Sequence, residues 1–195
     1  MTPPSLQRTV SYVAPQMAKT GLCVADWSFA DPQKNVNDFS FSQLTVGGGL
    51  VTYVFEGKSH FDVATRGLDG ERKTPGLQLQ LSKVAEAELE CMIACVQHEV
   101  LENATKFGMN ADDVQELFKS PMSKNGTFPA NLRVKMSGTR YWADGALTNA
   151  PDSHAGRKWQ AKVHFKSIWI APNAWGITCA ALDLQEMRTE VECPF

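Results

Sequence analysis

The stretch LQLQLSKVAEAELECMIACVQHEV, residues 77–100, decides the fold because the hydrophobic period changes inside it. In residues 77–81 leucine alternates with glutamine, which is the period of a strand with one buried face. After Ser82, a good N-cap residue, the apolar side chains follow helical spacing as far as Phe107. The stretch therefore predicts a strand that runs directly into a substantial helix, and Gly108 is the natural end of that helix.

The residues before this stretch have the pattern of strands. Two alternating runs, 39–46 and 50–57, flank the triple glycine at 47–49 and predict a β-hairpin. Residues 59–67 continue as a short strand, and 68–76 are polar enough to predict a loop.

The residues after the helix return to strand character. A short second helix is expected at 111–119, followed by a strand at 131–138. A long polar loop is expected at 139–159, before a final strand pair at 159–171 and 175–187. This order predicts a mainly β fold with an inserted helix, in which an OB-fold-like, five-stranded Greek-key barrel carries the helix between strands 3 and 4. An open α+β sheet is the alternative.

Length and composition are those of one ordinary globular domain, with 195 residues, 43% hydrophobic and 21% charged. We expect a flexible N-terminal arm at 1–20, a nucleic-acid-binding domain at 21–188 and a short C-terminal tail at 189–195. The chain has no apolar run of about 18 residues and no signal-peptide pattern, so an intracellular protein without membrane contact is expected. Five cysteines without a CxxC pair predict reduced thiols.

Charge is distributed unevenly although the net charge is only −2. The segment 119–166 contains nine basic and two acidic residues, whereas 82–118 contains two basic and eight acidic residues. Such asymmetry is typical of a protein with one face for a polyanion. The alternative, which the charge pattern alone slightly favours, is two solvated faces of opposite sign.

Basic residues alternate with apolar residues on two predicted strands, and aromatic rings stand close by. Val163 and Phe165 are expected to face the core, with Lys162, His164 and Lys166 facing outwards. Single-stranded nucleic acid is bound by such a combination of a cationic groove and rings that stack on bases. The candidate nucleic-acid-binding residues are Arg133, Lys135, Arg140, Tyr141, Trp142, Arg157, Lys158, Lys162, Lys166, Trp169 and Trp175. The alternative for Trp169 and Trp175 is burial in the core.

Motifs for catalysis or metal binding are weak. Cys91, Cys95 and His98 share a helical face, but small buried thiols explain that spacing better than a metal site. Asp62 beside His60 and Asp152 beside His154 are pairs of a kind that is common in loops. The usual nucleotide-binding, hydrolase and metalloprotease motifs are missing from the sequence. We therefore expect no enzymatic activity, no metal and no cofactor.

The sequence resembles the OB-fold single-stranded-DNA-binding replication proteins of phages and large DNA viruses. Three blocks carry the resemblance: residues 77–100, KNGTFPANLRVKM at 124–136 and KVHFKSIWIAPNAWGITCAALDLQEM at 162–187. The resemblance implies a non-catalytic protein that coats single strands during DNA replication or recombination at the site of viral or phage replication. It also implies a groove lined by Arg133, Lys135, Arg140, Trp142, Lys162, Lys166, Trp169 and Trp175.

Partners follow from the same resemblance. Single-stranded DNA is the expected ligand, with RNA as an alternative, and a homodimer is left open. Proteins of this kind recruit a polymerase or helicase through an acidic tail ending in phenylalanine, which Glu190, Glu192, Pro194 and Phe195 echo without a long acidic run. The competing hypothesis is a protein–protein adaptor that uses the aromatic hairpin as its interface, because Tyr, Trp and Arg also anchor protein interfaces.

Overall fold

The computed structural model describes residues 27–34, 39–66 and 72–187. The expected arm at 1–20 and the expected tail at 189–195 both lie outside these residues. The described chain is mainly β, and it divides into two compact units, each built from discontinuous segments. The first unit takes its residues from Met1–Tyr53, Glu88–Ser120 and His164–Thr178, and the second from Val54–Ala87, Pro121–Val163 and Cys179–Phe195.

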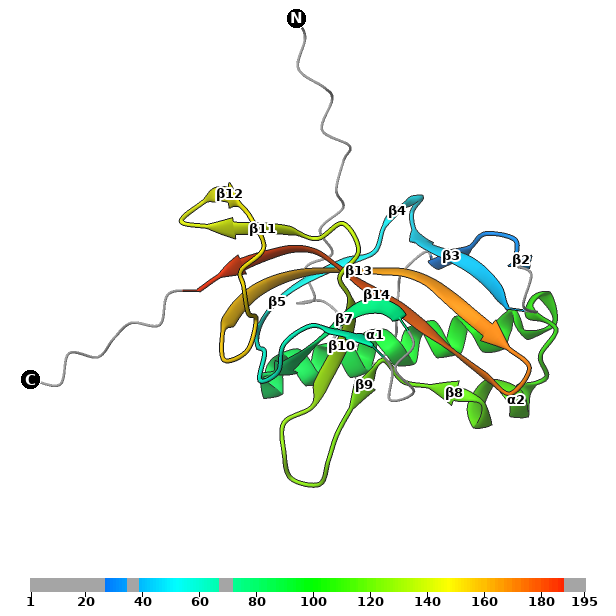
Figure 1. The fold of residues 1–195 in the computed structure, drawn as a ribbon. Helices are drawn as coiled ribbons and strands as arrows, with labels where there is room; N and C mark the ends of the chain where they lie inside the picture. The colour runs from blue at the N-terminus through cyan, green and yellow to red at the C-terminus, as the bar shows by residue number, and fades with distance from the viewer. Residues whose placement is uncertain (1–26, 35–38, 67–71, 188–195) are drawn as a thin grey trace, which may run out of the picture. The chain divides into compact units, whose positions relative to one another are not determined.

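Four elements, all labelled in Figure 1, contribute residues to both units. They are β5 (Thr52–Lys58), α1 (Lys83–Glu102), β13 (Lys158–Ala171) and β14 (Ala174–Glu186).

In the first unit, β3 is the central strand. It pairs antiparallel with β1, β2 and β4, and also with residues 167–170 of β13. The elements that belong to this unit alone are β1 (Trp27–Phe29), β2 (Gln33–Lys34), β3 (Ser40–Val46), β4 (Gly49–Leu50), a 3-10 helix (Ala104–Phe107), α2 (Ala111–Glu116) and β8 (Phe118–Lys119).

In the second unit, β7 and β10 pair antiparallel, with Leu79 opposite Leu132 and Leu77 opposite Val134, all four fully buried. β14 then pairs in parallel with β10 and with β11, and β11 forms a hairpin with β12. The elements that belong to this unit alone are β6 (Ala64–Arg66), β7 (Arg72–Leu81), β9 (Met122–Ser123), β10 (Asn131–Lys135), β11 (Arg140–Ala143) and β12 (Ala146–Thr148).

The period change at Ser82 is confirmed. The backbone N–H of Ala85 donates to the Ser82 hydroxyl at 3.2 Å, and Leu89, Val96 and Val100 form the fully buried stripe of α1. Gly108 takes a left-handed conformation with φ 69°, which ends the helical segment where the sequence predicted. α2 begins with a capping box between Asn110 and Asp113.

Two predicted loops contain strands instead. β7 already begins at Arg72, inside the expected loop 68–76, and the expected loop 139–159 contains the β11–β12 hairpin. That hairpin turns at Asp144 and Gly145, whose φ values of 51° and 78° are those of a type I′ turn. The expectation of uniformly reduced thiols is also wrong, because Cys95 is disulfide-bonded, although Cys91 and Cys179 are free.

Candidate nucleic-acid interface

In the second unit, one face of β11, β13 and β14 combines cations with an indole ring. Along β13 the odd residues Trp159, Ala161 and Val163 are buried, so the even residues Lys158, Gln160 and Lys162 project to the opposite side. Register places Arg140 beside Asp183, and Trp142 beside both Gln185 and Leu147. We call this surface the β11 face; it consists of Arg140, Trp142, Leu147, Lys158, Gln160, Lys162, Asp183 and Gln185.

β13 and β14 lie beside each other on this face. The backbone N–H of Met187 donates to the carbonyl oxygen of Lys158 at 2.9 Å. Lys162 lies close enough to Asp183 for its positive charge to help lower the pKa of that carboxylate. Three cations and one carboxylate give the charged side chains of the β11 face a net charge of +2.

Asp183 organises the centre of the face. Its carboxylate accepts two hydrogen bonds from the Arg140 guanidinium, at 2.8 and 2.9 Å, and a third from Trp142 Nε1 at 2.8 Å. Partial burial works to raise the pKa of Asp183, but these hydrogen bonds outweigh it and leave the pKa below its ordinary value. The guanidinium carbon lies 5.9 Å from the centre of the Trp142 ring, within cation–π range. The ionised carboxylate therefore fixes both the cation and the ring.

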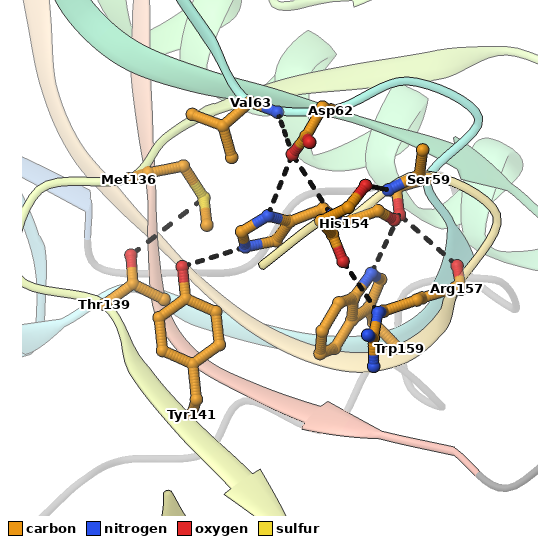
Figure 2. Close-up of polar contacts among 11 residues, drawn as sticks. Ser59, Asp62, Val63, Met136, Thr139, Tyr141, His154, Arg157 and Trp159 are labelled. Atoms are coloured by element: carbon orange, nitrogen blue, oxygen red, sulfur yellow. Dashed lines mark hydrogen bonds and ion pairs between the residues drawn. The ribbon is translucent and has the colours of Figure 1, made fainter. Parts of the chain in front are cut away.

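Tyr141 projects to the other side of β11, where a polar cluster holds the strand from behind (Figure 2). Its hydroxyl lies 3.0 Å from His154 Nε2, and His154 Nδ1 lies 3.2 Å from Asp62 Oδ1. The backbone N–H groups of His154 and Val63 also donate to Asp62 and lower its pKa to about 2. Because an ionised Asp62 can only accept, Nδ1 carries the proton, and in the neutral ring Nε2 accepts from Tyr141. Burial, with Asp62 nearby, raises the pKa of Tyr141, which keeps the phenol as a donor.

The same cluster pins the loop that precedes β13. The buried Ser59 hydroxyl donates to the carbonyl oxygen of His154 and accepts from Trp159 Nε1 at 2.9 Å. Arg157 donates to both carboxylate oxygens of Glu186, at 2.6 and 2.7 Å. Tyr141 and Arg157, both candidates for contact with nucleic acid, therefore already have protein partners in this cluster.

The predicted cations of β10 and β11 meet β14 at two different points. Arg133 and Lys135 are exposed on β10, as expected, but Lys135 pairs with Ala180 of β14, whereas Arg140 pairs with Asp183. Ala181 and Leu184, three positions apart, are both buried, so strict alternation does not hold between these two points of β14. Of the predicted residues, Arg140, Trp142, Lys158 and Lys162 belong to the β11 face.

The candidates in the first unit differ among themselves. Lys166 is exposed and Trp169 is half-buried, but Trp175 is fully buried, with its Nε1 donating to the carbonyl oxygen of Val114 at 2.9 Å. This burial contradicts the prediction that Trp175 stacks on bases, and it removes one of the two rings that the adaptor hypothesis requires. His164, expected to face outwards, is only 7% exposed.

Gly176 explains how the two tryptophans fit around the hairpin. A Cβ atom there would lie 2.6 Å from the carbonyl oxygen of Lys119 and 2.8 Å from the Trp169 ring. The missing side chain therefore leaves the space that Trp169 occupies, and Trp175 packs against Phe118 with ring centres 4.6 Å apart.

Other expectations concern metal, catalysis, the membrane and the C-terminus. Within the residues that the structure describes, no group of three or more His, Cys, Asp or Glu side chains could hold a metal ion. The structure pairs Asp62 with His154 rather than with its sequence neighbour His60, and sequence spacing alone could not show this. No helix in the described part of the chain is both long and apolar enough to cross a membrane. Glu190, Glu192, Pro194 and Phe195 lie outside the described residues.

Comparison with known proteins gives similarity at the level of structure alone, because no protein-family model and no curated protein sequence matches the chain. The single-stranded DNA-binding protein from bacteriophage Enc34, solved in complex with ssDNA, superposes with a TM-score of 0.50 at 13% identity, over 82% of this chain and 95% of the phage chain. A second structure of that phage protein gives a TM-score of 0.45 at 13% identity, over 86% and 96% of the two chains. The resemblance inferred from the sequence is thus confirmed for the fold, which this chain shares with a phage single-stranded DNA-binding protein.

Proposed function

We propose that this protein is a non-catalytic, sequence-tolerant single-stranded DNA-binding protein that acts in DNA replication or recombination. The β11 face is its proposed interface. The observation that carries the proposal is that Trp142 stands half-buried among Arg140, Lys158 and Lys162 on one face with a net positive charge. The shared fold with a protein that is solved in complex with ssDNA supports the same conclusion.

The chemistry of the face suits an unpaired strand. Lysine ammonium groups attract phosphates whatever the base sequence, and neutralising a phosphate releases condensed counterions. An indole face stacks on any base, at about 1–3 kcal/mol per base. Gln160 and Gln185 add exposed amides that can hydrogen-bond to bases or sugars without a fixed preference. Recognition of this kind favours coating over sequence readout.

We further propose that the fold is the five-stranded Greek-key OB-fold, with α1 between its third and fourth strands. The long strands β3, β5 and β7 precede α1, and β10 is the first strand of comparable length after it. In OB-folds, oligonucleotides bind along strand faces and the loops beside them, and the β11 face combines two strands of the sheet with the β11–β12 hairpin.

The test is a binding titration with labelled 20-nucleotide dT, dA and rU oligomers and a duplex of the same length, at low and high salt. Wild-type protein should bind dT and dA with similar affinity and lose affinity steeply with salt. Trp142→Ala should weaken binding by about 1–3 kcal/mol, and Trp142→Phe, which keeps a ring, should retain most of the affinity. Absence of binding by the wild type at low salt would overturn the proposed function. Equal affinity of wild type and Trp142→Ala would overturn the assignment of the interface.

A further inference from the structure

A short excursion leaves the sheet between β5 and β6. Both strands pair with β7, through Lys58 opposite Gln80 and Ala64 opposite Gly76. Residues 59–63 therefore lie outside the ladder, alongside the middle of β7. The sequence suggested a continuous strand at 59–67, so this excursion was not expected.

Both ends of the excursion are fixed by hydrogen bonds to the segment 154–157, as the contacts of Ser59 and Asp62 with His154 show (Figure 2). The Ser59 backbone N–H donates to the carbonyl oxygen of Arg157 at 3.0 Å, and its own carbonyl oxygen accepts from Gly156 at 2.7 Å. At the other end the Asp62 carboxylate accepts from the backbone N–H of His154 at 3.1 Å and from that of Val63 at 2.8 Å. The backbone between Ser59 and Asp62 is thus tied down on both sides.

Between these anchors, Phe61 is 71% exposed. Phe61 therefore presents a large apolar ring to solvent on a backbone that hydrogen bonds hold in place. A phenylalanine has only two side-chain torsions, and its neighbours are already ordered, so binding costs it little conformational entropy.

The strand surface beside the excursion is polar and basic. His60 Nε2 lies 2.8 Å from Gln80 Oε1, which places the excursion against that strand position. The register puts Gln80 between Lys58 of β5 and Asn131 of β10, and the next pair on the same side is Gln78 with Arg133. Two cations and a row of amides thus share one side of the sheet, and an unstacked base on its phosphate chain is complementary to this arrangement.

His154 connects this excursion to the interface proposed above. It binds Asp62, the neighbour of Phe61, through Nδ1 and Tyr141, the neighbour of Trp142, through Nε2. One buried histidine therefore holds the backbone segments that carry two separate rings. We propose that Phe61 is a second base-stacking residue for single-stranded DNA, with Lys58 and Arg133 as phosphate contacts beside it. This inference rests on the proposed function and extends it to Phe61 and Lys58, which the sequence analysis did not assign.

The experiment compares Phe61→Ala with Phe128→Ala, because Phe128 is also 71% exposed and lies in the same unit. Both variants should keep the wild-type melting temperature. Phe61→Ala should bind a dT oligomer about 5- to 150-fold more weakly than wild type, the range expected for one lost stacking contact, and Phe128→Ala less than twofold more weakly. An abasic oligomer of the same length keeps the phosphates without the bases, and both variants should bind it like wild type.

The outcomes separate the two proposals. If Phe61→Ala binds dT as tightly as Phe128→Ala while Trp142→Ala binds more weakly, Phe61 is not a stacking residue and the proposed function stands. If Phe61→Ala loses affinity equally for dT and for the abasic oligomer, the effect is not stacking and the inference fails. If the wild-type protein binds no dT at low salt, the inference fails together with the proposed function.

Discussion

Two aromatic regions of this protein look alike in sequence and differ in structure. The hairpin of the first unit carries Trp169 and Trp175, and the β11–β12 hairpin of the second unit carries Tyr141 and Trp142. In the first, Trp175 is sealed in the core and Trp169 fills the space over Gly176. In the second, Tyr141 is held from behind by His154, and Trp142 remains half-buried on a positively charged face.

The difference shows that an aromatic ring near cations has two quite different uses. A ring whose polar N–H meets a backbone carbonyl inside the unit, as in Trp175 with Val114, stabilises the fold. A ring whose N–H is taken by a surface carboxylate, as in Trp142 with Asp183, is oriented while its face stays available. Measuring both the stability and the DNA affinity of the same variants tests this distinction.

The largest effect is expected at Trp175. Replacement by alanine removes a fully buried indole and leaves the Val114 carbonyl oxygen without its donor. Such substitutions cost about 3–5 kcal/mol of unfolding free energy, or roughly 6–20 °C in melting temperature for a chain of this size. Trp142→Ala should change the melting temperature far less. Thermal melts followed by circular dichroism measure both.

For DNA affinity, the order of the two variants should be reversed. Below its melting temperature, the folded fraction of Trp175→Ala should bind a dT oligomer nearly as well as wild type, whereas Trp142→Ala should not. A Trp175→Ala protein that keeps wild-type stability would show that the indole is not a core residue. A folded Trp175→Ala protein that loses all affinity would place the first unit's hairpin in the interface.

Much of the fold could be predicted from the sequence because hydrophobic periodicity indicates which side of a strand or helix is buried. The alternation of Leu77, Leu79 and Leu81 and the helical spacing after Ser82 each follow from a single buried face, and both are confirmed. The β11–β12 hairpin was missed because its strands are short and do not alternate. Its signal was nevertheless present in Asp144-Gly145, a pair typical of type I′ hairpin turns.

The site could be predicted less completely, because alternation tells which face a side chain shares but not what covers that face. Lys166 and His164 have the same parity on β13, yet Lys166 is exposed and His164 is buried. The pairing of Asp62 with His154 joins residues 92 positions apart, and only the folded chain brings them together. Asp183 was not predicted because the candidate residues were chosen as cations and aromatic rings, and a carboxylate is neither.

A smaller effect is expected at the two lysines of the β11 face. Replacing Lys158 and Lys162 by glutamine should weaken dT binding at low salt and reduce the slope of log K against log salt by about 1.4, since each phosphate contact on a single strand contributes about 0.7. The double variant Lys34→Gln/Lys83→Gln makes the same charge change at two exposed lysines outside this face and should leave the slope nearly unchanged. Equal slopes for the two double variants would remove the lysines of the β11 face from the interface.

The smallest effect concerns the cluster behind β11, and it depends on pH. The folded-state pKa of Asp62 is about 2, below its ordinary value of 3.8, so ionisation of this carboxylate favours the folded state. That contribution is fully present above pH 4 and is lost as the pH falls from about 4 to about 2. Asp62→Asn should therefore melt slightly below wild type at pH 7, and the gap should close through this window. Asp152→Asn, the same change in the His154 loop, is the control; a wild-type-to-Asp62→Asn gap that stays constant down to pH 2 would mean that the charge of Asp62 does not hold the loop.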